Sequence, residues 1–126
     1  MRLLLDTHIV LWELGGTRTL GQRARSAIEA ASELAFSVVS FAEIGVKVAV
    51  GKLVVPPDLH RQVLASGLRI LGLAPDHALA VGELPLHHRD PFDRLLIAQA
   101  RSEQLTILTA DRRFAQYDVD TVDAAD

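Results

Sequence analysis

Short apolar runs alternate with longer amphipathic segments along the chain, and this pattern limits the possible folds more than any other feature. Four runs have the length and composition of buried strands: RLLL (2–5), LAFSVV (34–39), RILGL (69–73) and TILT (106–109). Helices are predicted over residues 8–14, 22–32, 41–50, 58–66, 76–84, 91–103 and 112–117. Strands that alternate with helices are typical of a parallel sheet with helices on both faces. We therefore predict an α/β fold of three layers with a mainly parallel central sheet.

Composition and charge narrow the class of protein further. The 126 residues are 49% hydrophobic and 23% charged, without repeats or low-complexity segments, so we expect a single domain over 1–126. A net charge of −3 argues against nucleic-acid binding through overall basicity. The absence of cysteine excludes disulfides, zinc–thiolate sites and cysteine nucleophiles. With no apolar stretch long enough to cross a membrane and an aspartate interrupting the first one, the expected location is the cytoplasm.

Several acidic residues lie just beyond the predicted strands. Asp6 directly follows strand 2–5, Asp111 follows TILTA, and Glu43 lies one short turn beyond strand 34–39. Because parallel strands end at the same edge of their sheet, these three carboxylates are expected to meet there. Asp93, in the first turn of the predicted helix 91–103, can join them if that helix begins at the same edge, and Asp90 is a fifth candidate.

Each of these acids also has a local structural explanation. Glu43 completes a capping-box pattern with Ser40 and an i,i+4 pair with Lys47. Three aspartates are suited to the N-cap of a helix: Asp6, Asp90 and Asp111. Taken singly, these structural roles are favoured, but they do not explain why four acids converge on one edge.

A cluster of carboxylates needs protons or a cation. Two carboxylates about 4 Å apart repel each other by roughly 4 kcal/mol at an effective dielectric constant near 20. Oxygen ligands without cysteine favour Mg²⁺ or Mn²⁺ over zinc. Such an ion can bind phosphate oxygens, orient a water molecule and lower its pKa, which is the chemistry of a metal-dependent nuclease.

Three histidines near these acids, His8, His87 and His88, offer a second arrangement, a mixed histidine–aspartate site for a transition metal. A lone histidine beside a turn is more often a surface or hydrogen-bonding residue, so we leave the histidines outside the predicted site. Trp12 is expected in the core or in an interface rather than as a base-stacking platform.

Four segments resemble the PIN-domain family and, within it, the VapC-type toxins of bacterial and archaeal toxin–antitoxin pairs. They are LLLDTHIVLW, SFAEIGVKVAVGKL, HRDPFDRLLIAQA and TILTADRRFAQY, in this order between residue 2 and about residue 120. The resemblance implies a PIN-like fold and a Mg²⁺- or Mn²⁺-dependent endoribonuclease that hydrolyses phosphodiester bonds in RNA. It also implies a homodimer that a VapB-type antitoxin neutralises.

Carried onto this chain, the resemblance implies an acidic quartet that serves both as catalytic residues and as metal ligands: Asp6, Glu43, Asp93 and Asp111. The hydroxyls of Thr7 and Thr109 match positions that help to hold such a site. Many relatives carry an acid directly before the phenylalanine of the last segment, where this chain has Arg113. Asp111 is therefore the preferred fourth acid and Asp118 a weaker alternative, while Asp90 is interpreted as the N-cap of helix 91–103.

The expected reaction is in-line attack of water on a phosphodiester, with 5′-phosphate and 3′-hydroxyl products. Arg94 and Arg112 are candidates for guiding RNA, and solvated salt bridges explain them equally well. The segment EIGVKVAVGKLVV (43–55) is unusually apolar, which fits either an antitoxin-docking face or buried core.

Three other classes of protein fit the sequence less well. A receiver domain requires paired acids after the first strand and a late lysine, but Asp6 stands alone and no lysine follows Lys52. A haloacid-dehalogenase-type phosphatase requires Asp-x-Asp where this chain has Asp6-Thr7-His8. A PIN-like binding module without nuclease activity remains the main alternative, and the presence of all four acids argues against it.

Overall fold

The computed structural model describes residues 1–126, which form five strands and six α-helices with two short 3₁₀ helices. In chain order these elements are β1 (Arg2–Leu5), α1 (Thr7–Gly15), α2 (Gln22–Ala30), β2 (Glu33–Ser37), α3 (Val38–Ala49), α4 (Leu59–Ala65), β3 (Arg69–Leu71), α5 (Pro75–Ala80), η1 (Val81–Glu83), α6 (Pro91–Glu103), β4 (Thr106–Thr109), η2 (Arg112–Gln116) and β5 (Thr121–Asp123). None of the helices combines the length and hydrophobicity that a membrane span needs.

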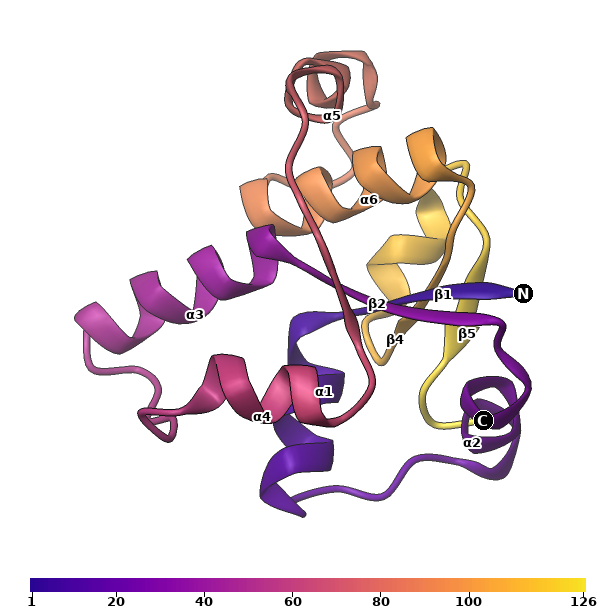
Figure 1. Cartoon of the computed structure of the whole chain (residues 1–126). Helices are drawn as coiled ribbons and strands as arrows, with labels where there is room; N and C mark the ends of the chain where they lie inside the picture. The colour runs from indigo at the N-terminus through magenta and orange to yellow at the C-terminus, as the bar shows by residue number, and fades with distance from the viewer.

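The strands form one sheet in the order β3-β2-β1-β4-β5, and every pair of neighbours is parallel. The predicted three-layer α/β fold is therefore confirmed. In Figure 1, α1, α2 and α4 lie on one face of the sheet, α5 and α6 lie on the other, and α3 extends outward from the end of β2. Strand β1 is central, with Leu4 opposite Ala35 of β2 and Ile107 of β4.

Two apolar clusters fix these layers because side chains alternate along the buried strands. Leu3 and Leu5 of β1 belong to the cluster under α1, α2 and α4, whereas Leu4 belongs to the cluster under α6. Helix α3 contributes to both, with Ile44 in the first cluster and Val39 in the second. The end of β2 and the start of α3 are thereby held firmly at one edge of the sheet.

The transition from β2 to α3 differs from the prediction. The expected strand 34–39 ends at Ser37, and Val38 already begins the helix. The Ser37 hydroxyl accepts the Val39 N–H at 2.9 Å and donates to the buried Gln99 amide oxygen at 2.5 Å. Ser37 is thus the N-cap, so the predicted capping box of Ser40 with Glu43 is wrong and both residues lie inside α3.

Other boundaries shift for local reasons. Strand β5 was not predicted, because it has only three residues at the edge of the sheet. The predicted helix 76–84 is α5 followed by the 3₁₀ turn η1, the predicted helix 112–117 is the 3₁₀ helix η2, and the predicted helix 22–32 ends at Ala30. The predicted strand 69–73 is only β3, ending at Leu71.

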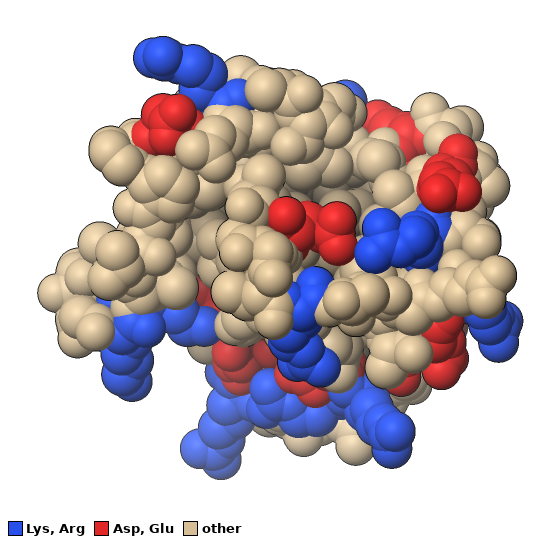
Figure 2. Space-filling view, turned by 90° about the horizontal axis from the view of Figure 1, so that it is seen from below, with Lys and Arg blue, Asp and Glu red and all other residues tan.

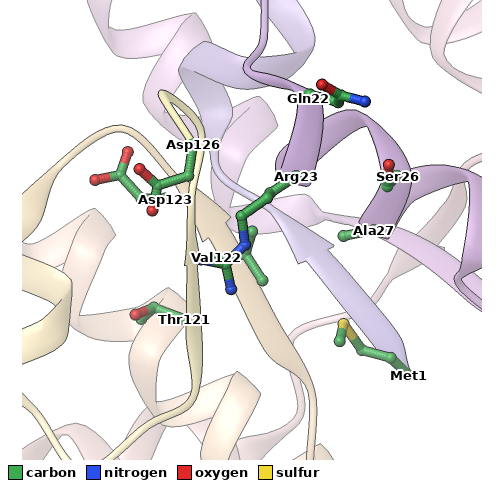
Figure 3. Close-up of a pocket in the computed structure, with 9 residues that line it drawn as sticks. All are labelled: Met1, Gln22, Arg23, Ser26, Ala27, Thr121, Val122, Asp123 and Asp126. Carbon is green, nitrogen blue, oxygen red and sulfur yellow. The ribbon is translucent and has the colours of Figure 1, made fainter.

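The end of the chain packs against the start of α2. The N–H groups of Gly21 and Arg23 donate to the carbonyls of Ala124 and Asp126 at 2.9 and 2.7 Å. A Cβ on Gly21 would lie 2.2 Å from the carbonyl carbon of Asp126, so this close approach requires glycine. Figure 3 shows the open hollow of about 560 Å³ beside this contact, between α2 and β5, which contains none of the predicted site residues.

Candidate functional site

All four predicted site residues line one open groove of about 510 Å³ at the carboxyl ends of the central strands. The lining contains five acids and four bases, together with His8, Trp12 and Ala110: the acids are Asp6, Glu43, Asp90, Asp93 and Asp111, and the bases are Arg18, Lys47, Arg112 and Arg113. Asp118 lies in a different hollow, beside Arg101 and Gln104. The groove thus brings together the acids of four segments far apart in the sequence.

Asp6 is a buried carboxylate held by two neutral donors. It is the N-cap of α1, and its Oδ1 accepts the Thr7 N–H at 2.7 Å. Its Oδ2 accepts the Thr109 hydroxyl at 2.8 Å, which links the ends of β1 and β4. Burial raises the pKa of Asp6, and the hydrogen bonds from Thr109 and Thr7 partly offset this effect. The predicted holding role of Thr109 therefore has a direct contact behind it.

Glu43 is fixed from both sides by α1 and by its own helix. Its Oε1 lies 2.8 Å from Thr7 Oγ1, which is also 2.7 Å from Ser40 Oγ. Because the Thr7 hydroxyl has one hydrogen, it donates to the carboxylate and accepts from Ser40. The other oxygen, Oε2, accepts from Lys47 Nζ at 2.7 Å, so the predicted i,i+4 pair is present.

Asp93 is the acid most affected by the groove. Burial is the largest cause that raises its pKa to about 8, and the charges of Asp90, Asp6, Glu43 and Asp111 raise it further. Asp93 therefore carries a proton at neutral pH unless a cation compensates the cluster. Asp90 accepts the N–H groups of Phe92 and Asp93 at 2.9 and 3.1 Å, which agrees with its predicted N-cap role.

His88 was not among the predicted site residues, but it contacts Asp93. Its Nε2 lies 3.3 Å from Asp93 Oδ2, and its Nδ1 lies 2.8 Å from the Tyr117 hydroxyl. Burial is the main cause that lowers the pKa of His88. Since both shifts favour uncharged forms, this contact is a neutral hydrogen bond rather than an ion pair. The only sequence signal for it is the position of His88 five residues before Asp93.

Both predicted roles of Arg94 are wrong. Its side chain is buried, so it neither guides RNA nor forms a solvated salt bridge. It is 7% exposed, and its guanidinium donates to the carbonyls of Val81, Leu84 and Pro85. It also donates to the Tyr117 hydroxyl at 3.3 Å. Arg94 thus ties the loop before α6 to the end of η2 and supports the surroundings of His88.

Asp111 begins η2 and is engaged by Arg113 two residues later. Its Oδ1 accepts the Arg113 N–H at 2.9 Å, and its Oδ2 lies 2.7 Å from Arg113 Nη2. These contacts lower the pKa of Asp111. The same Arg113 Nη2 lies 3.6 Å from Asp93 Oδ2, so one guanidinium spans two of the four predicted site acids.

The rim of the groove carries an aromatic and basic side chain in contact. Trp12 is half-buried against the core, as predicted, and the Arg18 guanidinium lies 4.1 Å from the centre of its ring. Figure 2 shows that on one face of the molecule basic side chains lie next to acidic ones, with wide uncharged areas between them. On this face, therefore, acidic side chains interrupt the basic ones.

The donors in the groove fit a hard divalent ion. The carboxylates and hydroxyls supply oxygen ligands, and burial together with neighbouring carboxylates raises the pKa values of Asp6 and Asp93, so a cation in the groove would favour their ionised forms. No three acidic or histidine side chains lie close enough to share one ion. Mg²⁺ commonly takes only one or two carboxylates directly and keeps several waters, so such a partial set of ligands matches its chemistry.

The fold and the groove define an all-parallel α/β domain with an acidic site outside the carboxyl ends of its strands. The PIN domain family model matches residues 3–120, and the chain belongs to this family. It is 32% identical over 117 residues to "Ribonuclease VapC22" of Mycobacterium tuberculosis (strain ATCC 25618 / H37Rv), with 90% of each chain covered. The resemblance seen in the four sequence segments is therefore confirmed.

Several solved structures share the fold of this chain. The chain matches VapBC2 from Rickettsia felis bound to a promoter DNA fragment with a TM-score of 0.73 and 17% identity, covering 98% of each chain. It matches FitAcB from Neisseria gonorrhoeae with a TM-score of 0.67 and 19% identity, covering 97% of each chain. For VapBC-5 from Mycobacterium tuberculosis the TM-score is 0.64 at 22% identity, with coverage of 98% and 99%.

Proposed function

We propose that this PIN-domain protein is an endoribonuclease toxin that depends on Mg²⁺ or Mn²⁺ and that a VapB-type antitoxin neutralises. The observation that carries the proposal is the convergence of Asp6, Glu43, Asp93 and Asp111 on one groove. The relative named as a ribonuclease and the family membership support RNA as the substrate. The structural matches to toxin–antitoxin complexes support the antitoxin partner.

In this proposal the chain's own residues bind and orient the reactants. Asp6 and Asp93 would hold the ion directly, and Glu43 and Asp111 would hold it directly or through water. Thr109 and Thr7 keep the carboxylates of Asp6 and Glu43 turned toward the groove. When bound, the ion would polarise the phosphate group of the RNA and lower the pKa of a water molecule. Asp93 must lose its proton before both of its oxygens can act as ligands.

The first experiment is cleavage of total cellular RNA by the purified, antitoxin-free protein with Mg²⁺, Mn²⁺ or EDTA. We expect cleavage with either metal, none with EDTA, and loss of at least about 100-fold in rate in Asp6→Asn and Asp93→Asn. Asp118→Asn is the matched control, because it makes the same acid-to-amide change outside the groove. Hydrolysis should leave 5′-phosphate and 3′-hydroxyl ends.

Three results would contradict the proposal. Cleavage that persists in EDTA would remove the metal dependence, and 2′,3′-cyclic phosphate ends would exclude direct attack by water. Intact RNA in every lane, from a protein with a normal melting curve, would instead favour a PIN-like binding module.

A further inference from the structure

Arg113 is the one cation that reaches two of the proposed metal ligands. Besides the 2.7 Å contact of Nη2 with Asp111 Oδ2, its Nε lies 3.1 Å from both oxygens of Asp111. Nη2 is also 3.6 Å from Asp93 Oδ2. The guanidinium therefore covers both oxygens of Asp111 and lies between the two aspartates, where it supplies positive charge without any bound ion.

Asp6 and Asp111 differ in whether a positively charged side chain binds them. Asp6, which shares the Thr109 hydroxyl with Asp111, receives only neutral hydrogen-bond donors, namely the Thr7 N–H and the Thr109 hydroxyl. Such donors orient a carboxylate, and no arginine or lysine forms an ion pair with Asp6 as Arg113 does with Asp111. The negative charge of Asp111 is already balanced by the Arg113 guanidinium, whose N–H groups match the geometry of a carboxylate. A divalent ion thus gains more attraction beside Asp6 than beside Asp111.

We propose that Arg113 takes the place of a second divalent ion, so that this chain binds one Mg²⁺ or Mn²⁺, beside Asp6 rather than beside Asp111. The inference rests on the proposed metal dependence and goes further by assigning the number of ions and the residue that limits it. Arg113 acts here as a positioning residue for Asp111. It competes with a divalent ion for the Asp111 carboxylate and is not itself a ligand.

Arg113 is well suited to substitution because its side chain is 52% exposed. Replacing it by glutamine removes the charge and keeps a polar side chain of similar reach, and replacing it by glutamate adds a ligand. The matched control is Arg112→Gln, which removes the same charge from the adjacent residue of the same groove. Arg112 has no ion pair with the site acids, so long-range electrostatics affects both variants and only Arg113→Gln removes the direct competition.

The test counts bound Mn²⁺ by isothermal titration calorimetry and by electron paramagnetic resonance, without RNA. We expect one ion per chain in the wild type and in Arg112→Gln. In Arg113→Gln and Arg113→Glu we expect a second ion beside Asp111, bound there at least about tenfold more tightly than by the wild type, because the ion no longer competes with a bound guanidinium. Melting curves recorded beside the titrations confirm that each variant is folded.

The outcomes separate this inference from the proposed function. Two ions in the wild type, or equal binding by wild type and Arg113→Gln, would overturn the role of Arg113 and leave the metal-dependent nuclease intact. An equal gain in Arg112→Gln would also overturn it, because the effect would then be general electrostatics. Absence of Mn²⁺ binding in the wild type and in every variant would overturn both the inference and the metal dependence.

Discussion

At the scale of single residues, Asp93 shows how the groove changes the chemistry of a side chain. An aspartate with a pKa of about 8 binds a proton more tightly in the folded protein than in the unfolded chain, where its pKa is near 3.8. The stabilisation by this proton is complete below the unfolded pKa and is lost as the pH rises through the folded pKa. The folded state therefore becomes less stable from about pH 4 to about pH 8 through this residue.

We predict that, in EDTA, the melting temperature of the wild type falls over this window and that Asp93→Asn reduces the fall. The amide has no proton to lose, so the variant gains on the wild type as the pH rises. Asp111→Asn is the control, since Arg113 lowers the pKa of Asp111 and its titration affects stability only at the acidic end. Parallel wild-type and Asp93→Asn curves, recorded by differential scanning calorimetry, would show that Asp93 is ionised at neutral pH.

At the scale of elements, helix α6 places Asp93 in the groove through its N-terminal cap. Asp90 accepts two N–H groups of the first turn and also adds negative charge beside Asp93. We predict that Asp90→Ala lowers the free energy of unfolding by about 1 kcal/mol in urea titrations, because the cap is lost. Asp90→Asn keeps the cap and removes only the charge, so it should retain most of the stability. Equal losses in both variants would mean that the charge matters more than the cap.

Elements whose residues carry their own start signals could be predicted from the sequence. Asp90 and Pro91 signal the start of helix α6, and the predicted bounds 91–103 are the bounds that the helix has in the structure. The meeting of the four acids could be expected because each follows a strand or begins a helix. The contact of His88 with Asp93 and the burial of Arg94 could not, since His88 is also held by Tyr117, 29 residues away, and Arg94 by backbone carbonyls of the preceding loop as well as Tyr117. The short strand β5 has only one large apolar residue, Val122, and gave no signal.

At the scale of the whole molecule, the apolar segment 43–55 is divided between the core and the surface. Ile44 is buried, whereas Val46, Val50 and Val54 are 51%, 62% and 95% exposed. The interpretation as buried core therefore holds for Ile44, and the antitoxin-docking face stays a prediction for the exposed valines. Val46 of α3 and Val50, the C-cap residue of that helix, lie one helical turn apart and are both exposed, and such an apolar surface suits a partner protein better than solvent.

We predict that Val50→Lys weakens the complex with the cognate antitoxin by at least about tenfold, because a charge in an apolar contact must be desolvated. Lysine is chosen because a cation is compatible with the C-terminal end of a helix. Leu79→Lys, at an exposed leucine of α5 in the other layer, is the control. The affinities are compared by titration of each purified variant with the antitoxin. Equal affinities for wild type and Val50→Lys would place the antitoxin elsewhere.

The pairing of β1 with β4 also has a consequence for how the protein is made. Asp6 accepts a hydrogen bond from Thr109, 103 positions later in the chain, and Asp111 comes two residues after Thr109. During translation, the first three site acids emerge from the ribosome well before β4 can add its strand beside β1. A nascent chain therefore has no complete groove until residue 111 has been released, and a ribosome making this protein is not exposed to a working site on its own unfinished product.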